Sequence, residues 1–255
     1  MLTAGIDIGA KTIKIVIVED GTIKARNKTL AGYQVKESLE KAWADLEAKS
    51  GIRPETIEKI VATGAGRKEA AKAAEDLTDV SAAAKGALAL DSSVRTVIDV
   101  GAEASRAIRI GPAGRVLDFA INEKCAAGTG AFIEAMARAI EVTIEELGAL
   151  SLRSTQSMAM NAQCAVFAES EFVTLVHSKT PKPDMARAIH DAIADRIVSM
   201  VRRVGSEPNV MLVGGVALNI GFVTSLKREL EARVIVPEGP EYVGAFGAAL
   251  VAAGN

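Results

Sequence analysis

The sequence is poor in several residue types, and each shortage excludes a class of protein. Its 255 residues include only two cysteines, too few for the disulfide framework of a small secreted domain. Aromatic residues make up 4% of the chain, so alanine, valine and isoleucine must supply most of the core. No apolar run reaches the length of a transmembrane helix, and no secretory leader pattern stands out. We therefore expect a cytoplasmic protein that does not enter a membrane.

The net charge of the chain is also small. It is formally -2, the pI is near 5.9, and lysine and arginine are scattered without forming a basic block. Such a chain has no general electrostatic attraction to nucleic acid or to an anionic membrane. Hydrophobic residues make up 49%, which at this length is enough for one large or two moderate domains.

Two segments of the chain resemble each other at a constant offset of 92 residues. Residues 6–18 and 98–110 share aspartate, glycine and alanine at equivalent places: Asp7 and Asp99, Gly9 and Gly101, Ala10 and Ala102. Each copy predicts a short strand, a tight glycine turn, a second strand rich in β-branched residues, a further turn and a third strand. Two similar β-rich units indicate two similar lobes.

Helical patterns follow each β-rich unit. The expected helices lie at 34–49, 70–84, 82–90, 128–141 and 183–203, of which 70–84 is the most alanine-rich. The hinge is predicted at 91–95. The first lobe would then comprise residues 1–92, completed by a C-terminal helix at 241–255, and the second lobe residues 93–240 with both cysteines.

The first glycine turn comes within one residue of a Walker A phosphate loop. The residues concerned are Gly5, Ala10, Lys11 and Thr12, with alanine in place of the second glycine. A Walker A loop runs from a strand into a helix, but residues 13–18 alternate as a β-branched strand does. The turn therefore joins two strands, and the Walker A interpretation is rejected.

An Asp-x-Gly hairpin suits a different phosphate site. The carboxylate of Asp7 can hold hydrated Mg, while turn N–H groups and the side chains of Thr12 and Lys14 contact phosphate oxygens. A single Asp-x-Gly hairpin is usually an ordinary turn. Its duplication at Asp99 favours the functional interpretation.

A glycine pair follows a buried strand predicted at 209–213. Gly214 and Gly215 lie at the switch from this strand to an amphipathic helix, where they would allow a flat ligand such as adenosine to come close. A tight strand-to-helix turn without a ligand explains the pair equally well. Gly244 and Gly247 recur in the final helix and are expected to allow close packing on the nucleotide side.

Each cysteine lies in an unusual setting. Cys125 shortly precedes Gly128-Thr129-Gly130, which opens a predicted helix, so backbone N–H groups and the helix dipole should lower its thiol pKa. Cys164 begins the run Cys-Ala-Val-Phe-Ala-Glu-Ser-Glu. An inert buried thiol, a disulfide and a metal ligand are the alternatives. Two thiolates cannot complete a four-cysteine iron-sulfur shell, but a two-fold homodimer would bring four together.

The combination of two Asp-x-Gly hairpins, a Gly-Gly turn and two α/β lobes resembles the actin, Hsp70 and sugar-kinase superfamily. The resemblance implies an α/β fold of two ribonuclease H-like lobes. The segments 124–130 (KCAAGTG) and 164–171 (CAVFAESE), with Ile189-His190 and Gly214-Gly215-Val216-Ala217, resemble the activators of 2-hydroxyacyl-CoA dehydratases and the related ATPase subunits of benzoyl-CoA reductases. This likeness covers nearly the whole chain.

The resemblance implies an ATPase coupled to low-potential, single-electron transfer. One 4Fe-4S cluster would be shared by a homodimer, with Cys125 and Cys164 of each copy as ligands. A ferredoxin or flavodoxin would donate electrons, and an iron-sulfur enzyme would accept them. Asp7 and Asp99 are the expected catalytic residues. The expected contacts to ATP or ADP with Mg are Gly9, Ala10, Lys11, Thr12, Lys14, Gly101, Glu103, Gly128, Gly130, Gly214, Gly215 and Glu241.

The chain departs from the family where the nucleotide is expected. Many members have serine at the position of Ala10, and family glutamines appear as Glu103, Leu218 and Glu241. Two extra carboxylates facing phosphate or ribose would weaken nucleotide affinity unless Mg or Lys11 offsets them.

Two other functions stay open from the sequence. A small-molecule kinase of the same superfamily would use a mid-chain aspartate such as Asp118 as general base. A nucleotide-sensing assembly protein without hydrolysis is the other alternative. His190 lies in a helical pattern and is expected to be structural.

Overall fold

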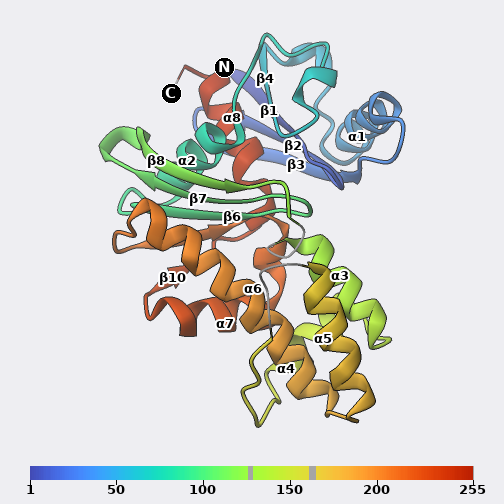
Figure 1. Ribbon diagram of the computed structural model, residues 1–255. Helices are drawn as coiled ribbons and strands as arrows, with labels where there is room; N and C mark the ends of the chain where they lie inside the picture. The colour runs from blue at the N-terminus through green and yellow to red at the C-terminus, as the bar shows by residue number, and fades with distance from the viewer. Residues whose placement is uncertain (126–128, 161–164, 255) are drawn as a thin grey trace. The chain divides into compact units, whose positions relative to one another are not determined.

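The computed structural model describes residues 1–125, 129–160 and 165–254. Within these ranges the chain forms two five-stranded sheets with helices, and it divides into two compact units (Figure 1). Unit 1 comprises Met1–Val94, Ile110–Val116 and Pro237–Asn255, and unit 2 comprises Arg95–Arg109 and Leu117–Val236. In the described part of the chain, no helix has both the length and the apolar character needed to cross a membrane.

The sheet of unit 1 has the strand order β3-β2-β1-β4-β5. Its strands are β1 (Leu2–Ile8), β2 (Thr12–Glu19), β3 (Thr22–Leu30), β4 (Lys59–Thr63) and β5 (Glu75–Asp76). β1 pairs antiparallel with β2 and parallel with β4, so it is the central strand. Isoleucines at alternate positions of β1 and β2 fill the core beneath α1.

The helical segments of unit 1 are α1 (Val35–Ser50), α2 (Asp79–Leu90), α8 (Val243–Ala252) and the short turns η1 (Pro54–Thr56), η2 (Arg67–Glu69), η3 (Pro112–Gly114) and η6 (Pro240–Tyr242). α8 packs on β1, β2 and β4, and α2 lies against α8 (Figure 1). Gly247 makes the α2 contact possible, because a Cβ there would collide with the carbonyl of Ala82. Gly244 faces the sheet instead, with Asp7 Oδ2 at 3.9 Å from a Cβ position.

The alanine-rich stretch 70–84 is not one helix, so that prediction was wrong in its first half. Glu75–Asp76 form β5, which pairs with β4, and α2 begins only at Asp79. Thr78 caps the helix by accepting a hydrogen bond from the N–H of Ser81 at 3.2 Å. Pairing with a neighbouring strand and the threonine cap outweigh the helix propensity of alanine.

The sheet of unit 2 has the order β10-β9-β6-β7-β8 and repeats the topology of unit 1. Its strands are β6 (Thr96–Val100), β7 (Ser105–Ile110), β8 (Val116–Asn122), β9 (Val210–Val213) and β10 (Val234–Ile235). β6 pairs antiparallel with β7 and parallel with β9, as β1 does with β2 and β4. The repeated three-strand units predicted from the sequence are thereby confirmed.

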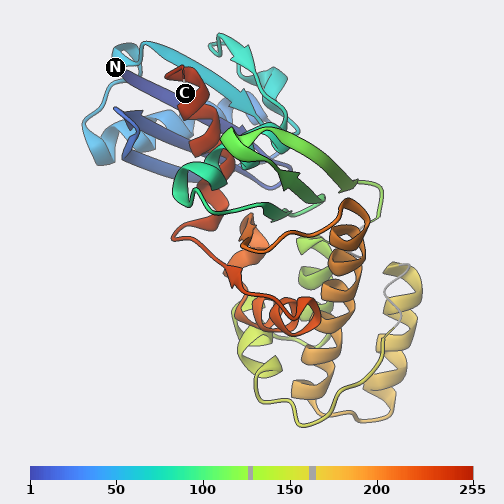
Figure 2. The ribbon, with the colours of Figure 1, turned by 90° about the vertical axis from the view of Figure 1, so that its left-hand side faces the viewer.

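The helices of unit 2 lie beside this sheet. They are α3 (Gly130–Ala139), α4 (Ile144–Ser151), α5 (Ala165–His177), α6 (Lys182–Val204), η5 (Gly215–Leu218) and α7 (Ile220–Leu230). α6 contacts both α4 and α7 (Figure 2). The predicted helices at 128–141 and 183–203 correspond to α3 and α6, whereas α4 was not predicted.

His190 is fully buried in the α6 segment of the unit 2 core. Its imidazole lies against the start of α7, where a Cβ on Gly221 would meet it at 2.6 Å. Burial lowers the pKa of His190 to about 4, although Asp191 and the Ala186 carbonyl act in the opposite direction. The expected structural role of this histidine is consistent with its burial.

We predict that His190 makes the folded chain less stable as the pH falls below about 6.5. Its folded pKa lies below that of the unfolded chain, so the unfolded state binds the proton first, and stability should drop by about 2 kcal/mol between pH 7 and pH 5. Urea unfolding across this range measures the loss. His190→Leu should flatten the profile, whereas His177→Leu, at the exposed second histidine, should leave it unchanged. An unaltered slope in His190→Leu would contradict the assignment.

We also predict opposite effects of two alanine substitutions in α8. Gly247→Ala should lower the free energy of unfolding by about 1–3 kcal/mol because the added methyl meets the α2 backbone. Gly244→Ala is the matched control, since its methyl has room and alanine favours a helix, and stability should stay equal or rise by up to about 1 kcal/mol. Equal stabilities for both variants would show that the α2 contact is not tight.

Candidate functional site

Asp7 and Asp99 occupy equivalent positions at the ends of the two central strands. Asp7 is the penultimate residue of β1, and Asp99 is the penultimate residue of β6. A tight turn follows each: the N–H of Gly9 donates to the Thr12 carbonyl at 3.0 Å, and that of Gly101 donates to Ala104 at 2.8 Å. The sequence repeat is therefore also a repeat of backbone geometry.

Each aspartate forms an ion pair with the residue opposite it on the next strand. Lys14 Nζ lies 3.0 Å from Asp7 Oδ2, and Arg106 Nη1 lies 2.8 Å from Asp99 Oδ2. The antiparallel registers place Asp7 opposite Lys14 and Asp99 opposite Arg106. All four side chains are between 13% and 16% exposed, so the charges are close to the surface yet largely shielded from water.

Arg106 was not predicted as a site residue. The signal was present, because Arg106 stands at the same offset of 92 from Lys14 as Asp99 does from Asp7. Lysine and arginine differ as residue types, but both place a cation beside the carboxylate.

A glycine from the neighbouring parallel strand approaches each aspartate. Gly64 follows β4 with φ +91°, and Gly214 follows β9 with φ +88°. A Cβ on Gly64 would stand 2.5 Å from Asp7 Oδ1, and one on Gly214 would stand 2.6 Å from Asp99 Oδ1. Both the positive φ and this approach require glycine. Gly64 was not predicted, although it follows an apolar strand as Gly214 does.

The second glycine of the pair, Gly215, has different surroundings. Apart from its two chain neighbours, no atom of the described residues lies within 4 Å of the position where its Cβ would be, so the space beside it is open. The N-terminus of α3 adjoins the same part of unit 2, because Gly130 and Ala131 donate their N–H groups to the carbonyls of Gly101 and Ala102 at 2.9 and 2.8 Å. The turn after Asp99 and the start of α3 are thus bonded together.

The predicted nucleotide contacts on the glycine turns differ in their surroundings: some lie beside the Asp7 ion pair and others are exposed. Gly9 lies with the Asp7 pair, since its Cβ position is 3.2 Å from Lys14 Nζ, and Thr12 is half-buried at the end of the same turn. Ala10 and Lys11 are exposed on that turn, and Glu103 is exposed on the corresponding turn of unit 2.

Glu241 is buried and forms a separate ion pair. Lys28 Nζ donates to Glu241 Oε1 at 2.8 Å, so a lysine of β3 compensates this carboxylate. Among the described residues, Glu241 Oε2 is buried without a hydrogen-bond partner. Such an atom can accept a hydrogen bond from a ligand hydroxyl.

Cys125 is a free, half-buried thiol just beyond β8. The side chain of Asn122 donates to the Cys125 carbonyl at 2.9 Å and holds this turn. Gly128 and Cys164 lie outside the described residues. In the described ranges, no three histidine, cysteine, aspartate or glutamate side chains gather as a metal site.

Residues 154–156, which precede Cys164 in the sequence, are hydrogen-bonded to α6. Asp184, which is buried, accepts hydrogen bonds from the Ser154 hydroxyl and from the N–H groups of Thr155 and Gln156, at 2.8 to 3.1 Å. The Ser154 hydroxyl is the main cause that lowers the pKa of Asp184. As a carboxylate, Asp184 therefore holds residues 154–156 against the start of α6.

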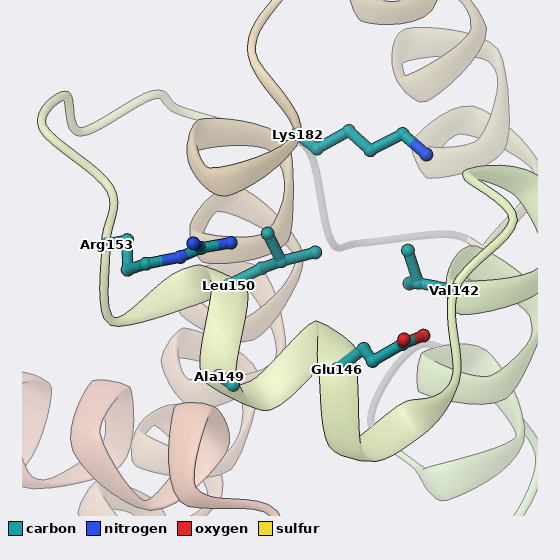
Figure 3. Close-up of a pocket in the computed structure, with 6 residues that line it drawn as sticks. All are labelled: Val142, Glu146, Ala149, Leu150, Arg153 and Lys182. Atoms are coloured by element: carbon teal, nitrogen blue, oxygen red, sulfur yellow. The ribbon is translucent and has the colours of Figure 1, made fainter.

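The hollow drawn in Figure 3 contains none of the predicted site residues. It has a volume of about 300 Å³ and is lined by Val142, Glu146, Ala149, Leu150, Arg153 and Lys182. Glu146 is already engaged there, because its carboxylate accepts the N–H of Thr143 at 2.7 Å in a capping box. Asp118, the residue considered for a kinase, is exposed on β8.

The chain is similar in sequence and in structure to dehydratase activators over almost all of its length. The 2-hydroxyisocaproyl-CoA dehydratase activator of Clostridioides difficile is 37% identical over 252 residues, which cover 99% of this chain and 95% of that protein. The solved structure of the activator from Clostridium difficile with bound ADPNP has a TM-score of 0.94 and 38% identity, covering 99% and 94% of the two chains.

Component A of the (R)-2-hydroxyglutaryl-CoA dehydratase of Acidaminococcus fermentans has a TM-score of 0.95 and 33% identity, with coverage of 99% and 97%. These similarities confirm the actin-like α/β fold. Residues 4–252 match the BadF/BadG/BcrA/BcrD ATPase family. With its two aspartate turns and this similarity along its length, the chain belongs to the BadF/BadG/BcrA/BcrD ATPase family.

Proposed function

We propose that this chain is an ATP-dependent reductive activator, which delivers single electrons at low potential to an iron-sulfur enzyme such as a 2-hydroxyacyl-CoA dehydratase or a benzoyl-CoA reductase. The observation that carries the ATPase part is the repeated ion pair, Asp7 with Lys14 and Asp99 with Arg106. An ordinary hairpin turn does not need a shielded carboxylate and cation at the same place in both repeats.

The two ion pairs support binding of a nucleotide with Mg. Carboxylate oxygens are hard ligands that Mg takes directly or through water, while lysine and arginine pair with phosphate oxygens. In each unit one carboxylate oxygen is held by the cation and the other lies beside a glycine without a side chain. We infer that Asp7 and Asp99 hold Mg and the attacking water, and that Lys14, Arg106 and the turn N–H groups bind phosphate.

The remaining expected contacts would bind the nucleoside. The open space beside Gly215 fits a flat base, and the unpartnered Glu241 Oε2 can accept a ribose hydroxyl. The ion pair with Lys28 neutralises Glu241 within the folded chain. The expected loss of nucleotide affinity from this carboxylate is therefore reduced by a lysine that the sequence did not point to.

Cys125 and Cys164 are the proposed ligands of a 4Fe-4S cluster shared with a second copy of the chain. The thiol of Cys125 is free and only half-buried, which suits a ligand set completed by another subunit. Such a cluster, when bound, would store one electron at low potential. A ferredoxin or flavodoxin is the proposed donor.

The hydrogen bonds between the Asp99 turn and α3 support the proposal that nucleotide binding acts on the cysteine segment. Gly101 and Ala102 hold the first turn of α3, and Cys125 precedes that helix by five residues. A nucleotide that prefers one position of the turn would shift the start of α3 and the peptide that carries Cys125. Only a difference in affinity between two arrangements can drive such a shift.

We predict that Asp7→Asn and Asp99→Asn each lower the kcat of ATP hydrolysis at least about 100-fold. Asparagine keeps the size but removes the charge that holds Mg and orients water. Asp20→Asn is the matched control, since Asp20 lies in an exposed turn of unit 1. Phosphate release measures the rate, and hydrolysis at the parental rate in both site variants would contradict the assignment.

We further predict that Cys125→Ser and Cys164→Ser each abolish the cluster. Anaerobically purified parent protein should contain about two iron and two sulfide per chain, and either variant should contain almost none. Asp7→Asn is the cross-control, because it should keep the iron while losing hydrolysis. A colourless, iron-free parent protein that phosphorylates sugars would establish the kinase alternative instead.

A further inference from the structure

The edge strand β8 of unit 2 carries an apolar stripe on its exposed face. Leu117, Phe119 and Ile121 alternate along the strand, so they share one face, and they are 48%, 51% and 41% exposed. Ala120, which points to the other face, is buried in the unit 2 core. β8 therefore packs on the core with one face and presents three large apolar side chains with the other.

The corresponding edge strand of unit 1 is built differently. β3 is also the outer strand of its sheet, and its exposed alternate positions hold Lys24, Arg26 and Lys28. Each of these forms an ion pair. Cations on an edge hinder pairing with another chain, because their charges would repel and lose water. Three cations therefore line the exposed alternate positions of β3, where β8 carries three large apolar side chains.

The backbone of β8 has a donor at its centre that a second strand could use. The N–H of Phe119 donates to the Asp118 carboxylate at 2.8 Å. Because this N–H group donates to an adjacent, exposed side chain, we infer that it lies on the open side of the edge strand. An approaching strand can replace the carboxylate and exchange two hydrogen bonds with Phe119.

The sequence of β8 and its flanks is complementary to itself in the antiparallel direction. If two copies align with Phe119 opposite Phe119, Leu117 of each copy lies opposite Ile121 of the other. Arg115 then lies opposite Glu123, and both residues are exposed. Both residues lie one position outside β8, so a residue of opposite charge from each copy would flank the apolar centre at each end.

We propose that β8 is a self-association surface, on which two copies of this chain pair antiparallel about Phe119 and join their unit 2 sheets. The surface is distinct from the cysteine-centred interface. β8 ends three residues beyond Phe119, and the hydrogen bond from Asn122 to the Cys125 carbonyl keeps Cys125 near that end, so this pairing holds the two Cys125 residues on the order of 20–30 Å apart. Two different two-fold contacts in one chain would build assemblies larger than a dimer. The inference does not depend on the cluster.

The first experiment removes the cluster interface. Sedimentation velocity of Cys125→Ser/Cys164→Ser over a concentration series should show a dimer, and adding Phe119→Lys should raise its dissociation constant at least about tenfold. Ile23→Lys, on the exposed edge of unit 1, is the matched control and should change nothing. Circular dichroism and thermal unfolding check that each variant is folded. A monomeric parent at every concentration, or association unaffected by Phe119→Lys, would overturn the proposal.

The second experiment tests the register in the same cysteine-free chain. Arg115→Glu and Glu123→Arg should each weaken association, and the combined reversal should restore it. Phe119→Cys should form a disulfide between copies under mild oxidation, whereas Leu117→Cys alone should not, because it lies opposite Ile121. No recovery in the double reversal, or equal linking at both positions, would exclude this pairing. In the chain that keeps its cysteines, Phe119→Lys should retain the iron, which separates this test from that of the proposed function.

Discussion

A carboxylate held against a cation at the end of a central strand is the constraint on which each unit depends. Removing two charges from water is unfavourable unless each finds a partner, so Asp7 requires Lys14 and Asp99 requires Arg106. Only an antiparallel register that places these residues opposite each other satisfies that need. The adjacent parallel strand must then end in a glycine with positive φ, because no side chain fits beside the carboxylate.

The same constraint organises what surrounds the aspartates. In unit 2, the turn after Asp99 supplies the carbonyls that accept the first N–H groups of α3, so the helix start is fixed to the turn. In unit 1, α8 packs on the central strand, and α2 packs on α8. The two repeats differ in the strands farther from the aspartates. The outer strand of unit 1 bears cations, and that of unit 2 bears leucine, phenylalanine and isoleucine.

The three-strand repeats were predictable because apolar residues alternate in the sequence with a period of two. The long helix α6 was predictable because its apolar residues recur with the period of a helix. β5 and β10 could not be predicted, since two residues carry no period and become strands only through their neighbours β4 and β9. The alanines before α2 favoured a helix, but pairing with β4 prevailed. Family membership and the actin-like fold, expected from the aspartate turns and cysteine segments, are confirmed.

For the site, the sequence alone determined which residue types recur and at what offset, because the duplication preserves order along the chain. It therefore singled out Asp7 and Asp99. The glycine pair at Gly214 was predicted separately, from its place between a buried strand and a helix. Only the tertiary structure decided the partners: Arg106 beside Asp99, Gly64 beside Asp7, and Lys28 beside Glu241. These contacts depend on the register between strands and on the packing of segments that are far apart in the sequence. The offset of 92 residues from Lys14 did mark Arg106. Spacing along the sequence could not identify Lys28 as the partner of Glu241, since a charge is compensated by what lies near it in space.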